Sequence, residues 1–194
     1  MSTKYKMKKL ENGNIRTCEV RLSFPHIFEP NDDGKYGAAI LFPEGADLSV
    51  LEKEIERVKK ETWGEKIPKN LRVGLRDQEE KEDEYEGYVA GRMFLNTTST
   101  KRVKVVDKNR EPVDDEDDLY PGVNAIVSLA VRARNPKKGE QFSPVIYFGL
   151  QSVQLLGGGE RMAGGVADPM KEFEEVEGLE DDASADSIFG EDEE

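Results

Sequence analysis

The segment YVAGRMFLN, residues 88–96, places two aromatic rings and a guanidinium at alternate positions. Because residues two apart share a face of a β-strand, Tyr88, Arg92 and Phe94 are expected on one face, opposite an apolar face. Aromatic rings can stack on any unpaired nucleobase, and a guanidinium can bind phosphate. The spacing predicts a base-stacking surface. The alternative is that Tyr88 or Phe94 packs beneath a loop.

Cations recur on or beside other expected strands. In NAIVSLAVRARN, residues 124–135, the odd-numbered positions are apolar and predict an inward face, so both arginines share the outer face. Two further pairs could bind phosphates or bases. Lys35 and Tyr36 place a cation beside a ring, and Lys101 and Arg102 are two adjacent cations. The alternative is that the cations only keep strand faces soluble and that the tyrosine lies in the core. These additional contact residues are Lys35, Tyr36, Lys101, Arg102, Arg132 and Arg134.

Catalytic and metal sites are poorly supported. The chain has one Cys and one His, so it can form neither an internal disulfide nor a Cys/His zinc site. Residues 77–86 and 114–118 are rich in acids, but consecutive carboxylates fan outward instead of converging on a magnesium ion. Cys18 and His26 have no evident acid-base partner. No enzyme activity, metal or cofactor is expected, and a magnesium-dependent nuclease is the weakest alternative.

The charge is concentrated at the C-terminus. The formal net charge is −13, and residues 171–194 alone hold twelve acids and one lysine, a net of −11. Residues 1–170 therefore carry a net of only −2. A nearly neutral body can present a basic surface beside acidic loops, so the total charge does not exclude a nucleic-acid partner.

Strand patterns dominate the body. In residues 16–24, Cys18, Val20, Leu22 and Phe24 alternate with polar residues and are expected to face inward. Further strands are predicted at 36–42, 88–97, 102–107, 124–135 and 144–156, and apolar residues at helical spacing predict a single main helix that ends near residue 63. The pattern predicts an all-β barrel or sandwich with one main helix.

The chain is expected to divide into a folded domain, residues 1–165, and a flexible linker with a disordered acidic tail, residues 166–194. The tail is poor in apolar residues and densely charged, a composition typical of disorder. Ile188 and Phe189 form an apolar pair within it, suited to docking on a basic pocket of a partner protein. The tail could also compete with nucleic acid for the body's own binding groove.

Several segments together resemble the bacteriophage single-stranded DNA-binding proteins of the OB-fold family. They are KYGAAILFP, YEGYVAGRMFLNTTSTKRVKVVDKNREPV, DLYPGVNAIVSLAVRARN, and GLQSVQLLGGGERMAGG before the acidic tail. The resemblance implies an OB barrel with a helix after its third strand and binding of single-stranded DNA in phage replication and recombination. It also implies that the tail contacts phage replication proteins such as the DNA polymerase.

Other expectations follow from composition. No secretory signal or membrane-spanning run is evident, so no membrane partner is expected and the protein is placed in the cytoplasm, that of the host cell if a phage encodes it. The motifs leave self-association into a homo-oligomer open. A different class of function, an acidic protein that mimics DNA and binds a basic site on another protein, is the main alternative.

Overall fold

The computed structural model describes residues 6–162 of the 194-residue chain. The acidic tail, with Ile188 and Phe189, lies outside the described residues. None of the helices in the described part is long and apolar enough to cross a membrane. The elements are β1 Lys8–Lys9, β2 Ile15–Arg16, β3 Val20–His26, β4 Gly37–Leu41, α1 Ser49–Trp63, β5 Arg72–Val73, β6 Leu75–Asp77, α2 Glu79–Glu82, β7 Met93–Thr98, β8 Lys104–Val106, the 3-10 helix η1 Glu116–Asp118, β9 Asn124–Arg134 and β10 Val145–Leu155.

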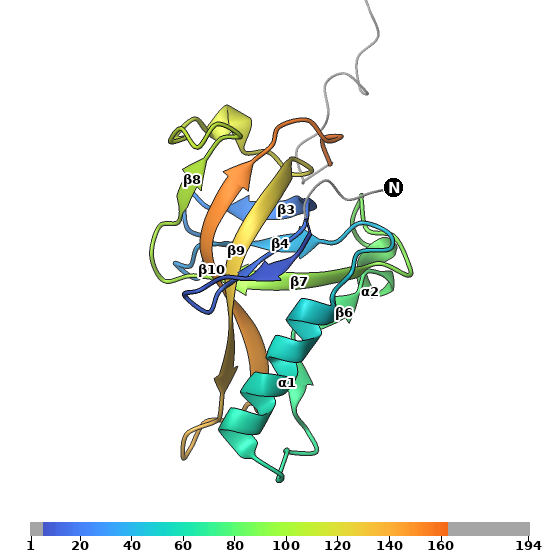
Figure 1. Cartoon of the computed structure of the whole chain (residues 1–194), viewed down its shortest axis with the longest axis vertical. Coiled ribbons are helices and arrows are strands. Elements are labelled where there is room, and N and C mark those ends of the chain that lie inside the picture. Colours follow the sequence, from blue (N-terminus) through green and yellow to red (C-terminus); the bar gives the residue numbers. More distant parts are fainter. Residues whose placement is uncertain (1–5, 163–194) are drawn as a thin grey trace, which may run out of the picture. The chain divides into compact units, whose positions relative to one another are not determined.

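Five strands close into a barrel of the OB type (Figure 1). Their order is β9-β3-β4-β7-β10, and β10 pairs with β9 to complete the ring. All neighbours are antiparallel except β7 and β10, which run parallel. This confirms the predicted β-rich barrel with one main helix. The helix α1 lies between β4 and β7, the second and third barrel strands, instead of after the third.

The barrel interior is filled by alternate residues of these strands, as half-buried strands require. Leu22, Ile40, Leu95, Leu129 and Ile146 are each fully buried or nearly so, and they come from all five barrel strands. The neighbours of these residues along each strand therefore point to the outer face of the barrel.

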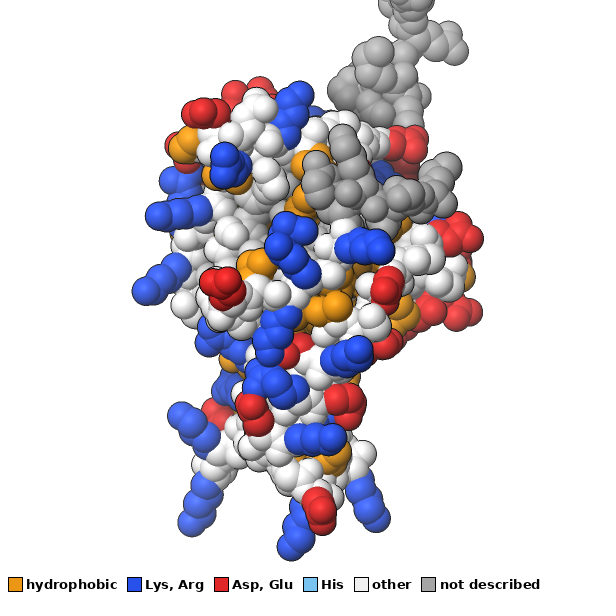
Figure 2. All heavy atoms as spheres, in the orientation of Figure 1, with side chains coloured by type: hydrophobic (Ala, Val, Ile, Leu, Met, Phe, Trp, Pro, Cys, Tyr) orange, Lys and Arg blue, Asp and Glu red, His pale blue; other side chains and the backbone are white. Residues whose placement is uncertain are grey.

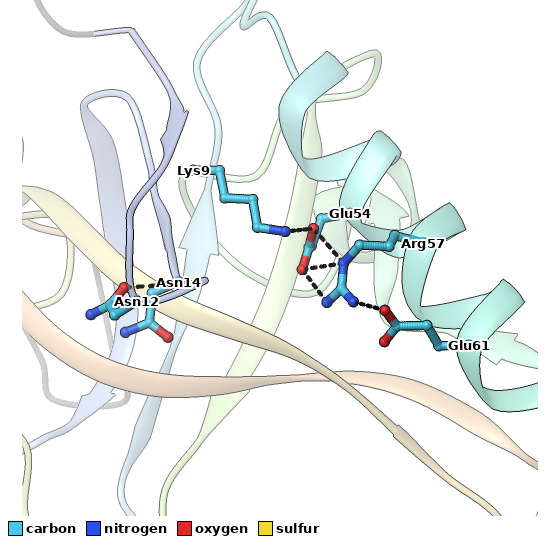
Figure 3. A network of polar contacts seen from close by, with 6 residues as sticks. All are labelled: Lys9, Asn12, Asn14, Glu54, Arg57 and Glu61. Atoms are coloured by element: carbon cyan, nitrogen blue, oxygen red, sulfur yellow. Dashed lines mark hydrogen bonds and ion pairs between the residues drawn. The ribbon is translucent and has the colours of Figure 1, made fainter.

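The helix α1 packs beside β9 and closes one end of the barrel (Figure 1). Leu51, Ile55 and Val58 are buried on its inner face. Glu54 is also buried, at 5% exposure, and its carboxylate accepts a 2.7 Å hydrogen bond from Lys9 Nζ and a 2.6 Å hydrogen bond from Arg57 Nη2 (Figure 3). This network ties the N-terminal strand to the helix.

One residue of β3 departs from the predicted alternation. Phe24 was expected inside the barrel, but it is 42% exposed and its φ is 48°. The pairing of β3 with β4 shifts register between Ser23 and His26, as in a β-bulge. An extra residue in one strand reverses the in-and-out alternation, which is why the expected position of Phe24 is wrong.

Candidate nucleic-acid interface

Five strands each contribute one residue to a row that crosses the outer face of the barrel. Ser23 of β3 lies opposite Ala39 of β4, which lies opposite Asn96 of β7. The parallel pairing of β7 with β10 begins at Thr97 and Phe148, so Asn96 and Tyr147 immediately precede its first pair. Tyr147 lies opposite Arg132 of β9. We call these five residues the cross-barrel row. At about 4.8 Å between strands, the row extends over roughly 19 Å.

The row is open at its β9 end and covered at its β3 end. Arg132 and Asn96 are exposed and Tyr147 is half-buried, whereas Ser23 and Ala39 are only 4% and 5% exposed. The open section thus presents a guanidinium, a phenol ring and an amide. These groups can bind a phosphate, stack on a base and form hydrogen bonds, respectively.

Two glycines beside the row let neighbouring groups pack closely. A Cβ at Gly149 would lie 3.2 Å from Arg132 Nε, so the side chain of Arg132 lies across the space that this glycine leaves. A Cβ at Gly37 would overlap the carbonyl oxygen of Thr97, so β4 and β7 can approach closely only with glycine there. The space beside Gly149 is thus occupied by the side chain of Arg132, and the space beside Gly37 by the backbone of β7.

Four predicted contact residues gather where β4 begins and β7 ends. Tyr36 and Ser99 form an isolated bridge, with N to O distances of 2.9 and 2.7 Å, and the backbone of Lys101 hydrogen-bonds the Ser99 hydroxyl. Lys35 and Lys101 are exposed. Arg102 is exposed too and lies 5.4 Å from the centre of a neighbouring phenylalanine ring. We call Lys35, Tyr36, Lys101 and Arg102 the Tyr36 corner.

Arg134 continues the outer face of β9 beyond Arg132. Its guanidinium lies 4.5 Å from the centre of the Phe142 ring and 3.1 Å from the Glu140 carboxylate, so the tip of the β9–β10 hairpin holds it in place. Figure 2 shows Lys and Arg side chains projecting from the part of the molecule that contains α1 and the far ends of β9 and β10. Acidic side chains lie among them, so this part of the molecule carries both signs of charge (Figure 2).

The predicted platform on residues 88–96 is not formed. The strand β7 starts at Met93, so Tyr88 does not belong to it. Tyr88 and Phe94 are only 6% and 1% exposed and contact each other edge-on, with ring centres 5.4 Å apart. The alternative interpretation, that these rings pack beneath other parts of the chain, describes their position. Arg92 lies at the surface, 3.4 Å from Glu44.

A turn and a buried amide explain this error. Gly91 has a φ of 78°, which interrupts the extended backbone that the alternation assumed. The side chain of Gln78, which is 1% exposed, donates to the carbonyls of Phe42 and Met93 and accepts from the amide of Val89. The chain before β7 is therefore held as a turn.

The residues that follow β10 cover Phe94 and Tyr88. We call residues 156–162 the C-terminal strap. The hydroxyl of Tyr120 donates to the carbonyl of Gly158 at 2.7 Å, and the amide of Met162 donates to the carbonyl of Pro121 at 2.9 Å. Met162 is 4% exposed and packs in one cluster with Ala39, Leu41, Tyr88 and Phe94. The strap thus helps to bury these two rings, together with Arg76 over Phe94 and Tyr85 beside Tyr88.

The covered section is poorly solvated, and this affects the pKa of its tyrosine, Tyr88. Burial raises the pKa of the Tyr88 phenol, while a hydrogen bond with Ser23 acts in the opposite direction. The guanidinium of Arg76 lies 4.7 Å from the centre of the Phe94 ring and forms the outer edge of this section. Burial thus disfavours the charged form of the Tyr88 phenol.

The structure also contains candidate contacts that the sequence arguments missed. The alternation used for residues 124–135 could have found Tyr147, because its strand neighbours Ile146 and Phe148 are buried. Asn96 has the same parity as Arg92 and Phe94, but asparagine is too common a residue type to be singled out. Phe24 could not be found, since nothing in the local pattern reveals the bulge.

The described residues show no arrangement suited to catalysis. None of the groups of His, Cys, Asp and Glu within residues 6–162 could hold a metal ion. Burial raises the pKa of the Cys18 thiol, which disfavours the reactive thiolate. The acidic run at 114–118 is exposed, and part of it forms η1.

Comparison with known proteins also indicates nucleic-acid binding. The family model described as "Enterobacter phage Enc34, ssDNA-binding protein" matches residues 13–184. The protein p50 of Acyrthosiphon pisum secondary endosymbiont phage 1 is 30% identical over 187 residues, which cover 87% of this chain and 96% of that protein.

Solved structures share the fold. The single-stranded DNA-binding protein of bacteriophage Enc34, in complex with ssDNA, superposes with a TM-score of 0.66 at 20% identity and covers 80% of this chain and 93% of its own. The single-stranded DNA-binding protein gp2.5 of bacteriophage T7 superposes with a TM-score of 0.59 at 15% identity and covers 90% of this chain and 99% of its own.

Proposed function

This chain belongs to the family of the Enterobacter phage Enc34 single-stranded DNA-binding protein, and from that premise we propose that it binds single-stranded DNA without sequence preference and without catalysis. The observation that carries the proposal is the open section of the cross-barrel row, where Arg132, Tyr147 and Asn96 lie on neighbouring strands. A ring and a cation on adjacent strands fit a flexible strand with accessible bases. The Enc34 protein itself has been solved with ssDNA.

The strand is proposed to run from the Tyr36 corner across the open section of the row to Arg134. The phosphate contacts are Lys35, Lys101, Arg102, Arg132 and Arg134, and the bases stack on Tyr36 and Tyr147. Arg92 lies near the covered section and contributes at its edge. Tyr88 and Phe94 contribute only when the C-terminal strap is displaced, because both rings are buried beneath Met162.

In the cell, the protein is proposed to protect or organise single strands during phage DNA replication and recombination, in the cytoplasm of the host. The acidic tail, through Ile188 and Phe189, contacts replication proteins such as the DNA polymerase. Its net charge of −11 also competes with DNA for the basic surface. Association into a homo-oligomer is compatible with this role.

The test is a fluorescence-anisotropy titration with single-stranded, double-stranded and RNA oligonucleotides. We expect binding to single-stranded DNA of different sequences with similar affinity, weaker binding to duplex, and a loss of affinity as salt increases. A form that lacks residues 171–194 should bind as tightly or more tightly. If no oligonucleotide binds at low salt, the proposal is wrong and the acidic DNA-mimic alternative is favoured.

A further inference from the structure

Two exposed aromatic rings from distant segments meet beside the covered end of the cross-barrel row. Phe24 of β3 and Tyr85, which follows α2, are 42% and 40% exposed. Their ring centres are 5.0 Å apart and their planes make an angle of 86°. An edge-on contact covers at most one face of one ring, so flat ring surface remains for a ligand.

The backbone holds Phe24 in this position at a cost. Its φ of 48° lies in the left-handed region, which a bulky residue rarely adopts. The bulge between Ser23 and His26 turns the ring outward, although inward burial of the same ring would stabilise the barrel. Strain of this kind is concentrated at binding sites, where the surrounding structure maintains it.

The pair is supported by a series of rings that leads into the protein. Tyr85 lies 6.1 Å from Tyr88, and Tyr88 lies 5.4 Å from Phe94, with both distances measured between ring centres. Tyr88 and Phe94 are buried and fix the inner end of the series. The exposed rings are therefore supported by packed aromatic side chains, which reduces the entropy lost when a ligand binds.

The pair also lies next to the cross-barrel row. Ser23, the β3 residue of the cross-barrel row, immediately precedes Phe24 in the chain. The ammonium of Lys81 lies 5.2 Å from the centre of the Tyr85 ring, but residues 77–86 contain seven acids and one lysine. Phosphates are repelled by this loop, whereas the face of a neutral base is not. The surroundings favour a base over the sugar-phosphate backbone.

We infer that Phe24 and Tyr85 form a stacking subsite for one unpaired nucleobase beside the covered β3 end of the cross-barrel row. The inference rests on the proposed function. Stacking on a ring releases no counterions, so this subsite adds affinity that is independent of salt, in contrast to the arginine contacts. It is also indifferent to base identity, because every base has a π-face.

The test uses Phe24→Gly and Tyr85→Ala in the full-length chain, with a fluorescent oligonucleotide titrated at 50 and 200 mM salt. Each variant should lose roughly tenfold in affinity, the size of one lost base stack, and by the same factor at both salt concentrations. Ile67→Ala removes an equally exposed apolar side chain from the loop after α1 and should leave affinity unchanged.

Thermal unfolding of the same variants separates binding from structure. Glycine is relaxed at the positive φ of Phe24, so Phe24→Gly should change Tm by no more than about 2 °C. Arg110 also has a positive φ, of 70°, and Arg110→Gly serves as the control for relief of strain. The subsite would be overturned if the wild type bound DNA and both variants bound it equally well. A large loss of Tm in Phe24→Gly would also overturn it. Absence of binding by the wild type would instead overturn the proposed function.

Discussion

Arg132 is the cation through which the proposed path can be tested most quantitatively. It is exposed, lies across Gly149 and pairs with Tyr147 on the neighbouring strand. Replacing it by Gln keeps a side chain of similar reach but removes the positive charge. Because Arg132 points outward from β9, away from the core, the substitution should leave the fold intact.

The size of the effect follows from counterion release. Five proposed phosphate contacts predict a slope of log affinity against log salt of roughly −3.5 on a single strand, and loss of one contact predicts about −2.8. Between 50 and 200 mM salt, the wild-type affinity should therefore fall roughly 130-fold and that of Arg132→Gln roughly 50-fold. The two lines should converge as salt increases.

The assay is an anisotropy titration at four or five salt concentrations, with Lys60→Gln as the matched control. Lys60 is an exposed cation on α1, which packs beside β9. On β9, Val131 and Ala133 face the core and Arg132 does not. Lys60→Gln should reproduce the wild-type slope. Equal slopes for wild type and Arg132→Gln, or an equal change in the Lys60 control, would refute the placement of DNA over Arg132.

Three further predictions concern the fold and the strap. Gly37→Ala places a Cβ against the Thr97 carbonyl and should lower the free energy of unfolding by about 1–3 kcal/mol. Gly149→Ala meets only side-chain atoms of Arg132 and Gln151 and should weaken DNA binding without loss of Tm; the reverse result would contradict both predictions. Glu54→Gln should cost roughly 1–3 kcal/mol at pH 7 in urea unfolding. Hydrogen bonds from Arg57 and Lys9 hold the pKa of the Glu54 carboxyl below its ordinary 4.5, so its stabilisation is present above pH 4.5 and is lost as the pH falls through the folded-state pKa. A difference from wild type that persists at pH 2 would argue against this. Met162→Ala should lower stability by about 2 kcal/mol and raise affinity for single-stranded DNA several-fold as Phe94 and Tyr88 become accessible, and unchanged affinity would show that the strap does not restrict binding.

The sequence was sufficient to predict the architecture because alternation over long strands is a strong signal. The apolar positions of residues 124–135 match the buried face of β9, and the helix ends at Trp63 as its pattern indicated. Register and closure could not be predicted. The parallel pairing of β7 with β10 depends on contacts between segments about fifty residues apart.

The site was predictable only where a regular strand carried it. Arg132 and Arg134 lie on the outer face because β9 is regular. Tyr88 and Phe94 were misplaced because a turn at Gly91 ends the alternation and Met162, almost seventy residues later, covers both rings. Phe24 was misplaced because a single inserted residue reverses the two faces of a strand. The assignment of all these residues to DNA contact stays a prediction.

The central claim, that a single strand crosses the open section of the cross-barrel row, is tested most directly by photo-crosslinking. Full-length protein would be irradiated with an oligonucleotide that carries 5-iodouracil, and the modified peptides would be identified by mass spectrometry. We predict crosslinks at Tyr147 and Tyr36. Trp63 lies at the far end of α1, where its indole donates to Asn135. Crosslinks at Trp63 alone, with none at Tyr147 or Tyr36, would contradict the account.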